Sequence, residues 1–117
     1  MWKVQTTDLF DQWFKGRDDS DRVNIIAAML VLEQKGPYLL RPYADTVKGS
    51  VHANMKELRI QSKGRPIRVF FAFDPRRTAV LLCAGMKAGK EKRFYQTMIP
   101  LADKAFSLHL EQLKKGG

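Results

Sequence analysis

Three consecutive β-strand patterns, joined by short turns, limit the folds that this chain can adopt. Residues rich in β-formers run over 56–62, 66–74 and 78–86, and the segments SKGRP and DPRR between them hold the residue types that tight turns require. Pro66 is tolerable at the first position of its strand, where a missing ladder donor matters least. The segment 56–86 therefore predicts an antiparallel meander.

Helical patterns precede the meander. A short strand at residues 2–6 leads into a helix that Thr7 and Asp8 cap and that ends at Gly16. Its apolar residues recur at one-turn spacing and are candidates for the core: Leu9, Phe10, Trp13 and Phe14.

A second helix is predicted over residues 22–35 and is closed by Gly36 and Pro37. The residues before it can cap the helix and place negative charge at its positive end: Asp18, Asp19, Ser20 and Asp21. Five apolar residues follow the i, i+3, i+4, i+7, i+8 spacing of one helix face: Val23, Ile26, Ala27, Leu30 and Val31. This spacing makes the second helix the most strongly indicated element of the chain.

The remaining segments are a long surface loop at 37–54, which contains His52, and a helix at 91–115 that Pro100 should break or kink. Two neighbouring apolar rows should bury this last helix: Leu101, Ala105 and Leu108, and beside them Ala102, Phe106 and Leu113. His52 and His109 have no motif around them, and we expect His52 to be a bystander and His109 to lie on the surface or in a satisfied core position.

The element order β-α-α-β-β-β-α predicts one α+β domain over residues 1–117, with helices packed on a small, mainly antiparallel twisted sheet. Cys83 is the only cysteine and lies in an apolar run, so we expect a buried thiol and a reducing cytoplasm. The N-terminus shows no signal-peptide pattern, and no apolar run is long enough to span a membrane.

Positive charge is concentrated in the second part of the chain. The net charge is +9, and 15 of the 21 Lys and Arg residues follow residue 47, against 5 of the 12 Asp and Glu residues. This asymmetry indicates a face that binds a polyanion, most often a nucleic acid, although solubility alone is the plainer explanation.

Strand alternation decides where the cations of the meander point. One face of the strand pair is apolar and holds Leu58, Ile60, Ile67, Val69, Phe71 and Phe73. Arg59 and Arg68 belong to the other face, which should contain both polar and apolar side chains. Lys87 follows the third strand, and we expect it to converge with Arg59 and Arg68 on an open concave surface of the sheet. A mid-strand arginine should face a carboxylate, solvent or an anionic ligand, because an unpaired buried cation is costly.

A convergent set of Arg and Lys side chains suits a phosphodiester. Each guanidinium can donate two parallel hydrogen bonds to phosphate oxygens, and the cations stabilise the extra negative charge of a transition state. The segment GMKAGK lacks the spacing of a nucleotide-binding loop, and the sequence holds no cluster of metal ligands. We therefore expect neither a metal nor a cofactor.

Several motifs carry a resemblance to a known family: KELR at 56–59, GRPIRV at 64–69, FAFDP at 71–75 and GMK at 85–87, followed by FYQTMIPLADKAF in the last helix. Over nearly the whole chain the sequence resembles the HigB-like branch of the RelE/ParE superfamily of bacterial toxin-antitoxin systems. The resemblance implies a compact toxin that enters the ribosomal A site and cuts mRNA without a metal. In such toxins the ribose 2′-hydroxyl attacks the adjacent phosphate and leaves a cyclic phosphate.

The resemblance also assigns roles to residues. Arg68 matches the strand arginine that holds the scissile phosphate, Arg59 falls near a basic residue of the preceding strand, and Lys87 matches the cation after the last strand. Tyr95 resembles an aromatic residue that stacks on a base or takes part in proton transfer. The cations expected to bind RNA are Lys56, Lys63, Arg65, Lys90 and Arg93. Glu57 departs from the family pattern, because a cation is expected near its position.

Alternatives remain open at this point. Arg59 and Arg68 fit structural ion pairs, Lys87 and the nearby cations fit a solvated helix start, and Tyr95 fits a core stripe. A ParE-like inhibitor of DNA gyrase would share the scaffold without nuclease chemistry, and a third possibility is a domain that binds RNA through charge alone. The resemblance further implies a cognate antitoxin, a separate chain that usually carries a helix-turn-helix domain, so that operator DNA is contacted only through it.

Overall fold

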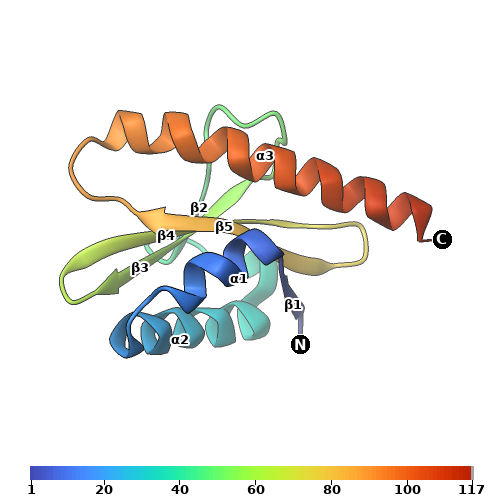
Figure 1. The fold of residues 1–117 in the computed structure, drawn as a ribbon. Helices are drawn as coiled ribbons and strands as arrows, with labels where there is room; N and C mark the ends of the chain where they lie inside the picture. The colour runs from blue at the N-terminus through green and yellow to red at the C-terminus, as the bar shows by residue number, and fades with distance from the viewer. Residues whose placement is uncertain (117) are drawn as a thin grey trace.

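In the computed structural model, which describes residues 1–116, one five-stranded sheet lies between two layers of helices (Figure 1). The strands are β1 (Lys3–Thr6), β2 (Ala44–Thr46), β3 (Lys56–Ser62), β4 (Arg65–Phe73) and β5 (Thr78–Met86). The helices are α1 (Asp8–Lys15), α2 (Asp19–Lys35), a 3-10 turn η1 (Gly36–Tyr38) and α3 (Glu91–Lys115). Helices α1 and α2 cover one face of the sheet, and α3 covers the other (Figure 1).

The predicted α+β class and the antiparallel meander β3-β4-β5 are confirmed. The strand order is β1-β5-β4-β3-β2, in which β1 runs parallel to β5 and all other neighbours are antiparallel. The β3–β4 turn has only two central residues, Lys63 and Gly64, with φ of 54° and 74°. Two positive φ values match the right-handed twist of the flanking strands, which keeps the hairpin in a single register. That register pairs Arg59 with Arg68.

The expected caps of the first two helices are present. The Thr7 hydroxyl accepts a hydrogen bond from the Phe10 amide, and the Asp18 carboxylate accepts one from the Asp21 amide at 2.9 Å. Gly36 ends α2 with a φ of 55°, and a Cβ at this position would lie 2.3 Å from the Trp2 indole. Glycine is therefore required here both by the backbone conformation and by the packing of the tryptophan.

The five regularly spaced apolar residues of α2 point away from the core. Ile25 and Leu32 are the fully buried apolar residues of this helix. The five regularly spaced apolar residues are all exposed: Val23, Ile26, Ala27, Leu30 and Val31. Because α2 carries apolar residues on both sides, the spacing identifies the helix but does not show which side is buried.

The last helix differs from expectation in two respects. It continues without interruption through Pro100, so of the expected break or kink the break is wrong. Of the two apolar rows, the one with Ala102 and Phe106 is buried, whereas Leu101 and Leu108 are exposed. A proline inside a helix removes one donor, and the packing of this long helix along the sheet offsets that loss.

The expected long loop at 37–54 contains two short elements, η1 and β2. The three residues of β2 pair with β3, with Ala44 opposite Leu58, and the Tyr43 carbonyl accepts a hydrogen bond from the Arg59 amide. So short a strand has no sequence pattern of its own and forms because β3 offers it a free edge.

The sheet has a core on both faces, so the expectation of a mixed second face is wrong for most of its length. Phe71 and its neighbours on one face pack under α1 and α2, and Phe70, Ala72 and Leu82 pack under α3 together with the buried thiol of Cys83. Burial raises the pKa of that thiol to about 12. None of the helices within residues 1–116 has both the length and the apolar character of a membrane-spanning segment.

Asp74 and His109 join the end of β4 to α3. The Asp74 carboxylate accepts hydrogen bonds from the Arg76 and Thr78 amides, and it lies 2.8 Å from Nε2 of His109, which is also buried. Burial raises the pKa of Asp74, but the hydrogen bonds from His109, Thr78 and Arg76 outweigh that effect and hold it below the ordinary 3.8. His109 is therefore a satisfied core residue, and His52 bonds Ser107 on the outside of α3.

We expect Asp74→Asn to lower the free energy of unfolding by about 1–2 kcal/mol near neutral pH, because a charged acceptor of three hydrogen bonds is lost. The pKa of Asp74 is lower in the folded state than in the unfolded state, so the ionised carboxylate stabilises the fold at any pH above the unfolded-state pKa. This stabilisation is lost as the pH falls through the folded-state pKa. Urea unfolding of both proteins at neutral pH and in acid should therefore show a difference that shrinks in acid. Equal stability at neutral pH would contradict the assignment.

Candidate active site

The candidate site forms where the first turns of α3 cross strands β3 and β4. Arg59 and Arg68 are cross-strand partners, so their side chains lie on the same face of the sheet, the one that α3 covers. Arg68 is in turn opposite Gly85 on β5. A Cβ at Gly85 would lie 3.0 Å from the Phe94 ring, so this glycine lets the start of α3 approach the strands closely.

Glu57 is the centre of this arrangement. Its side chain is buried, its Oε1 accepts a hydrogen bond from the Tyr95 hydroxyl at 2.7 Å, and its Oε2 accepts one from Nε of Arg59 at 3.1 Å. Arg59 also donates from Nη2 to Asp45 of β2 at 3.1 Å. A single carboxylate therefore holds both a guanidinium and a phenol in place.

Arg68 differs from the other cations because it is buried without a counter-ion. Only 8% of its surface is exposed, and its Nη1 donates to the Ile67 carbonyl at 3.2 Å. Within residues 1–116 no carboxylate lies within salt-bridge distance of Arg68, and its Nε has no hydrogen-bond partner. A buried guanidinium in this state is costly unless an anion binds it.

Lys87 completes the set of cations. Its Nζ lies 2.9 Å from Oε1 of Glu91 and 5.9 Å from the centre of the Tyr95 ring. The hydrogen bond and charge of Lys87 lower the pKa of Glu91, and the charges of Arg68 and Arg59 lower it further. The lowered pKa of Glu91 is therefore caused by the positive electrostatic potential of these three cations.

Tyr95 is kept in its protonated form. Burial raises the pKa of its hydroxyl, the bond to Glu57 raises it further, and Arg68 partly opposes both, with a resulting value of about 12. At neutral pH this phenol is a hydrogen-bond donor and a potential acid, and it is not a base. Its ring packs edge-on against Phe70, so Tyr95 occupies the core position that was one of the alternatives, and its hydroxyl also bonds Glu57.

An open hollow of about 440 Å³ reaches the two arginines from the edge of the sheet, where β2 ends and leaves β3 uncovered. Its lining includes Asn24, Pro42, Tyr43, Arg59, Gln61 and Arg68. The candidate site is therefore approached from the sheet edge. The predicted open concave surface is absent here, because the start of α3 covers this part of the sheet.

The cations expected to bind RNA are not all near this cluster. Lys63 pairs with Asp18, and Arg65 lies 3.7 Å from Asp21, so both belong to the side of the sheet covered by α2. Of the remaining three, Lys56 bonds Thr46 on β2, and Lys90 and Arg93 line an open hollow of about 480 Å³ at the start of α3.

The sequence reasoning gave Glu57 no catalytic role and did not consider Asp45. Glu57 precedes Arg59 by two residues and so shares its strand face, a signal that was available in the KELR motif. Asp45 reaches Arg59 only through the pairing of β2 with β3, which the sequence does not indicate. Within residues 1–116 no three His, Cys, Asp or Glu side chains are grouped in a way that could hold a metal ion.

Comparisons with known proteins identify the family of the chain. A family described as "Phage derived protein Gp49-like (DUF891)" matches residues 12–107. Two relatives from Mycobacterium tuberculosis (strain H37Rv) are described as "Putative toxin HigB2", 48% identical over 87% of this chain, and "Putative toxin HigB3", 42% identical over 92% of both chains. The chain spans 51% of the length of the first of these relatives.

A solved structure of an E. coli toxin RelE mutant in the free state has the same fold, with a TM-score of 0.56 over 80% of this chain and 90% of that one. The two sequences are only 6% identical, so this likeness concerns the fold alone. The family match and the relatives confirm the HigB-like resemblance drawn from the motifs: the chain belongs to the Gp49-like family, together with HigB-like toxins.

Proposed function

We propose that this protein is the toxin of a toxin-antitoxin pair and an endoribonuclease that cuts mRNA on the ribosome. The observation that carries the proposal is the buried Arg68, which has no counter-ion within residues 1–116 and an unpartnered Nε. A phosphate that enters from the sheet edge would satisfy both the charge and the free donor. Arg59, next to it across the strands, would supply a second guanidinium.

The proposed reaction needs only side chains of this chain. The 2′-hydroxyl of the nucleotide before the cut attacks the phosphorus, the 2′-O–P bond forms and the P–O5′ bond breaks. Glu57 takes the proton of the 2′-hydroxyl, and Tyr95 gives its proton to the departing 5′-oxygen. The products are a 2′,3′-cyclic phosphate and a 5′-hydroxyl, and the charge that builds up on the phosphate oxygens is stabilised by Arg68, Arg59 and Lys87.

The contact between Glu57 and Tyr95 supports this assignment. After the reaction Glu57 carries a proton and Tyr95 lacks one, and a hydrogen bond of 2.7 Å joins the two groups. Transfer of that proton along the bond restores both residues. The raised pKa of Tyr95 favours the return, because the phenolate holds a proton more strongly than an ordinary tyrosinate does.

Two of the three cations of the cluster, Arg59 and Lys87, are paired with carboxylates of the chain itself. Arg59 is bound by Glu57 and Asp45, and Lys87 by Glu91. Phosphate must therefore compete with carboxylates except at Arg68, which suits an enzyme that is active only where another assembly positions the RNA. We propose that this assembly is the ribosomal A site, and that the antitoxin, with a helix-turn-helix domain of its own, blocks entry to it.

The experiment that tests the function is 3′-end mapping of a translated reporter mRNA in a purified translation system. We expect cuts with cyclic phosphate ends when ribosomes translate the mRNA, and intact RNA when ribosomes are left out. Intact mRNA in both samples would overturn the nuclease proposal, and inhibition of gyrase supercoiling by the same protein would then support the ParE-like alternative.

A further inference from the structure

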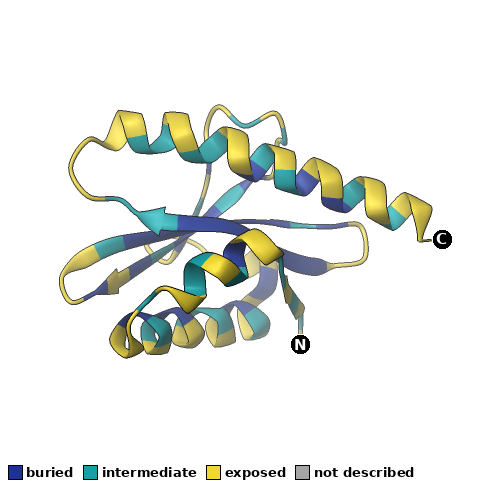
Figure 2. Ribbon diagram, in the orientation of Figure 1, coloured by how far each residue is buried: buried dark blue, intermediate teal, exposed yellow. Residues whose placement is uncertain are grey.

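The outer side of α2 carries an unpartnered apolar surface, here called the α2 stripe and defined by Val23, Ile26, Ala27, Leu30 and Val31. The four larger side chains have exposed fractions of 65%, 46%, 55% and 43% in chain order. They lie on one side of the helix over about 12 Å, because an α-helix rises 1.5 Å per residue. Figure 2 shows this exposed side of α2 turned away from the sheet.

A stripe of this kind is unusual on a surface helix. The side of α2 that packs on the sheet already holds Ile25 and Leu32, so the fold does not need further apolar residues on the other side. Single exposed apolar residues are common, but a contiguous set at helical spacing marks a protein interaction surface. Residues at the spacing i, i+3, i+4, i+7 are the ones that contact a second helix when it packs along the first.

We propose that the α2 stripe is the docking surface for the antitoxin, which places on it an apolar segment of complementary spacing. The inference rests on the antitoxin partner proposed above and is independent of the nuclease chemistry. The stripe lies on the opposite face of the sheet from Arg59 and Arg68, so this contact holds the antitoxin without using the catalytic cluster.

Charge and area favour a different chain over a second copy of this one. Each copy carries a net charge of +9, so self-association brings together two strongly cationic molecules, whereas a partner of opposite net charge meets no such repulsion. The carboxylates at the start of α2 are already paired: Asp18 with Lys63, Asp19 with Arg22 and Asp21 with Arg65. A stable interface buries about 800 Å² per partner, more than two short stripes provide against each other. A partner that extends beyond the stripe can reach this area.

The test uses the antitoxin encoded in the same operon as the toxin, purified and titrated into the purified toxin by calorimetry. Leu30→Glu places a carboxylate in the middle of the stripe at an already exposed position of a helix, where glutamate is well tolerated. We expect affinity for the antitoxin to fall at least about 30-fold, as at a binding hot spot. Leu30→Glu without antitoxin should cut mRNA as the wild type does.

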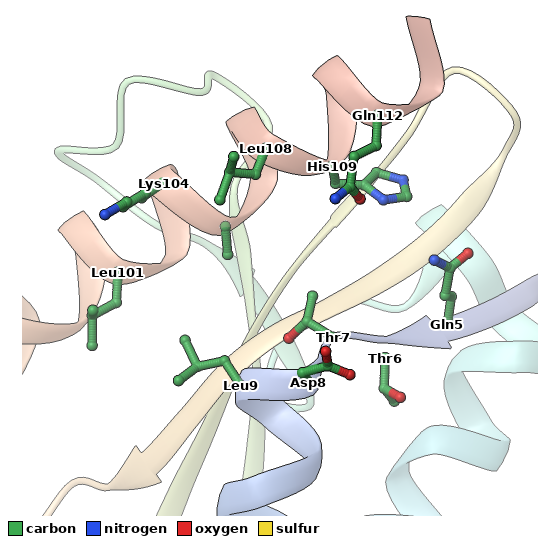
Figure 3. A pocket seen from close by; sticks show the side chains of 11 residues that line it. Gln5, Thr6, Thr7, Asp8, Leu9, Leu101, Lys104, Leu108, His109 and Gln112 are labelled. Carbon is green, nitrogen blue, oxygen red and sulfur yellow. The ribbon is translucent and has the colours of Figure 1, made fainter. Parts of the chain in front are cut away.

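The matched control is Leu108→Glu on α3. Leu108 is exposed to a similar extent, 50%, and lines a hollow of about 410 Å³ between α1 and α3, together with Leu9 and Leu101 (Figure 3). We expect Leu108→Glu to change the affinity by less than about threefold. A loss of binding with Leu108→Glu and none with Leu30→Glu would move the docking surface to that hollow and overturn the proposal.

Two further outcomes would also overturn it. Wild-type affinity of Leu30→Glu for the antitoxin would show that the stripe is not used. A wild-type toxin that is dimeric by light scattering, and that Leu30→Glu makes monomeric, would assign the stripe to a second copy of the chain. Because binding is measured without RNA, failure of the nuclease proposal would appear only in the mRNA mapping and would leave this result intact.

Discussion

Methionine in place of Arg68 should lower ribosome-dependent mRNA cleavage by about 10²-fold or more, because a donor to the transition-state phosphate is lost. The same substitution should raise the free energy of unfolding, by about 1 kcal/mol or more, because it replaces a buried cation without a counter-ion by an apolar side chain of similar length. Opposite effects on activity and stability are expected of a functional residue that the fold tolerates at a cost.

The control for Arg68→Met is Arg76→Met, which removes the same charge from the exposed β4–β5 turn. Arg76→Met should leave cleavage within a few fold of wild type, which separates a specific contact from a general loss of positive charge. If Arg68→Met instead destabilises the protein and keeps its cleavage activity, Arg68 is a structural residue. Urea unfolding and 3′-end mapping on the same preparations give both readouts.

The meander could be predicted from the sequence because its determinants are local. Strand alternation and two turns with suitable residues place Arg59 opposite Arg68 once the two-residue turn at Lys63 and Gly64 is formed. The caps at Thr7 and Asp18 are equally local, and both formed as expected. Such features depend on a few neighbouring residues and are not altered by the rest of the fold.

What could not be predicted depends on contacts between distant segments. Both sides of α2 are apolar, so only the packing against the sheet decides that Ile25 is buried and Leu30 is exposed. The pairing of Arg59 with Asp45 requires β2, which has no pattern of its own. The role of Glu57 was missed for a further reason: its partner Tyr95 is 38 residues away on α3, and only the crossing of that helix over β3 joins them.

Glutamine in place of Glu57 should lower the cleavage rate by about 10²–10⁴-fold, the range expected when a general base is removed. The amide keeps the size of the side chain and an acceptor for Tyr95, but it cannot take the 2′-hydroxyl proton.

Tyr95→Phe removes the proposed acid and should reduce the rate with little change in RNA affinity. Because burial and Glu57 raise the pKa of Tyr95 to about 12, the phenol should remain protonated over the working pH range.

Single-turnover pH–rate profiles separate a catalytic from a positioning role for Glu57. If Glu57 is the base, the wild-type rate falls on the acid side and the residual rate of Glu57→Gln does not, since the group that is protonated there has been removed. If Glu57 only positions Arg59 and Tyr95, both proteins keep the same acid limb. Glu91→Gln is the matched control: it is the same chemical change at the edge of the same cluster, it releases Lys87 from its ion pair, and it should leave the rate equal or higher.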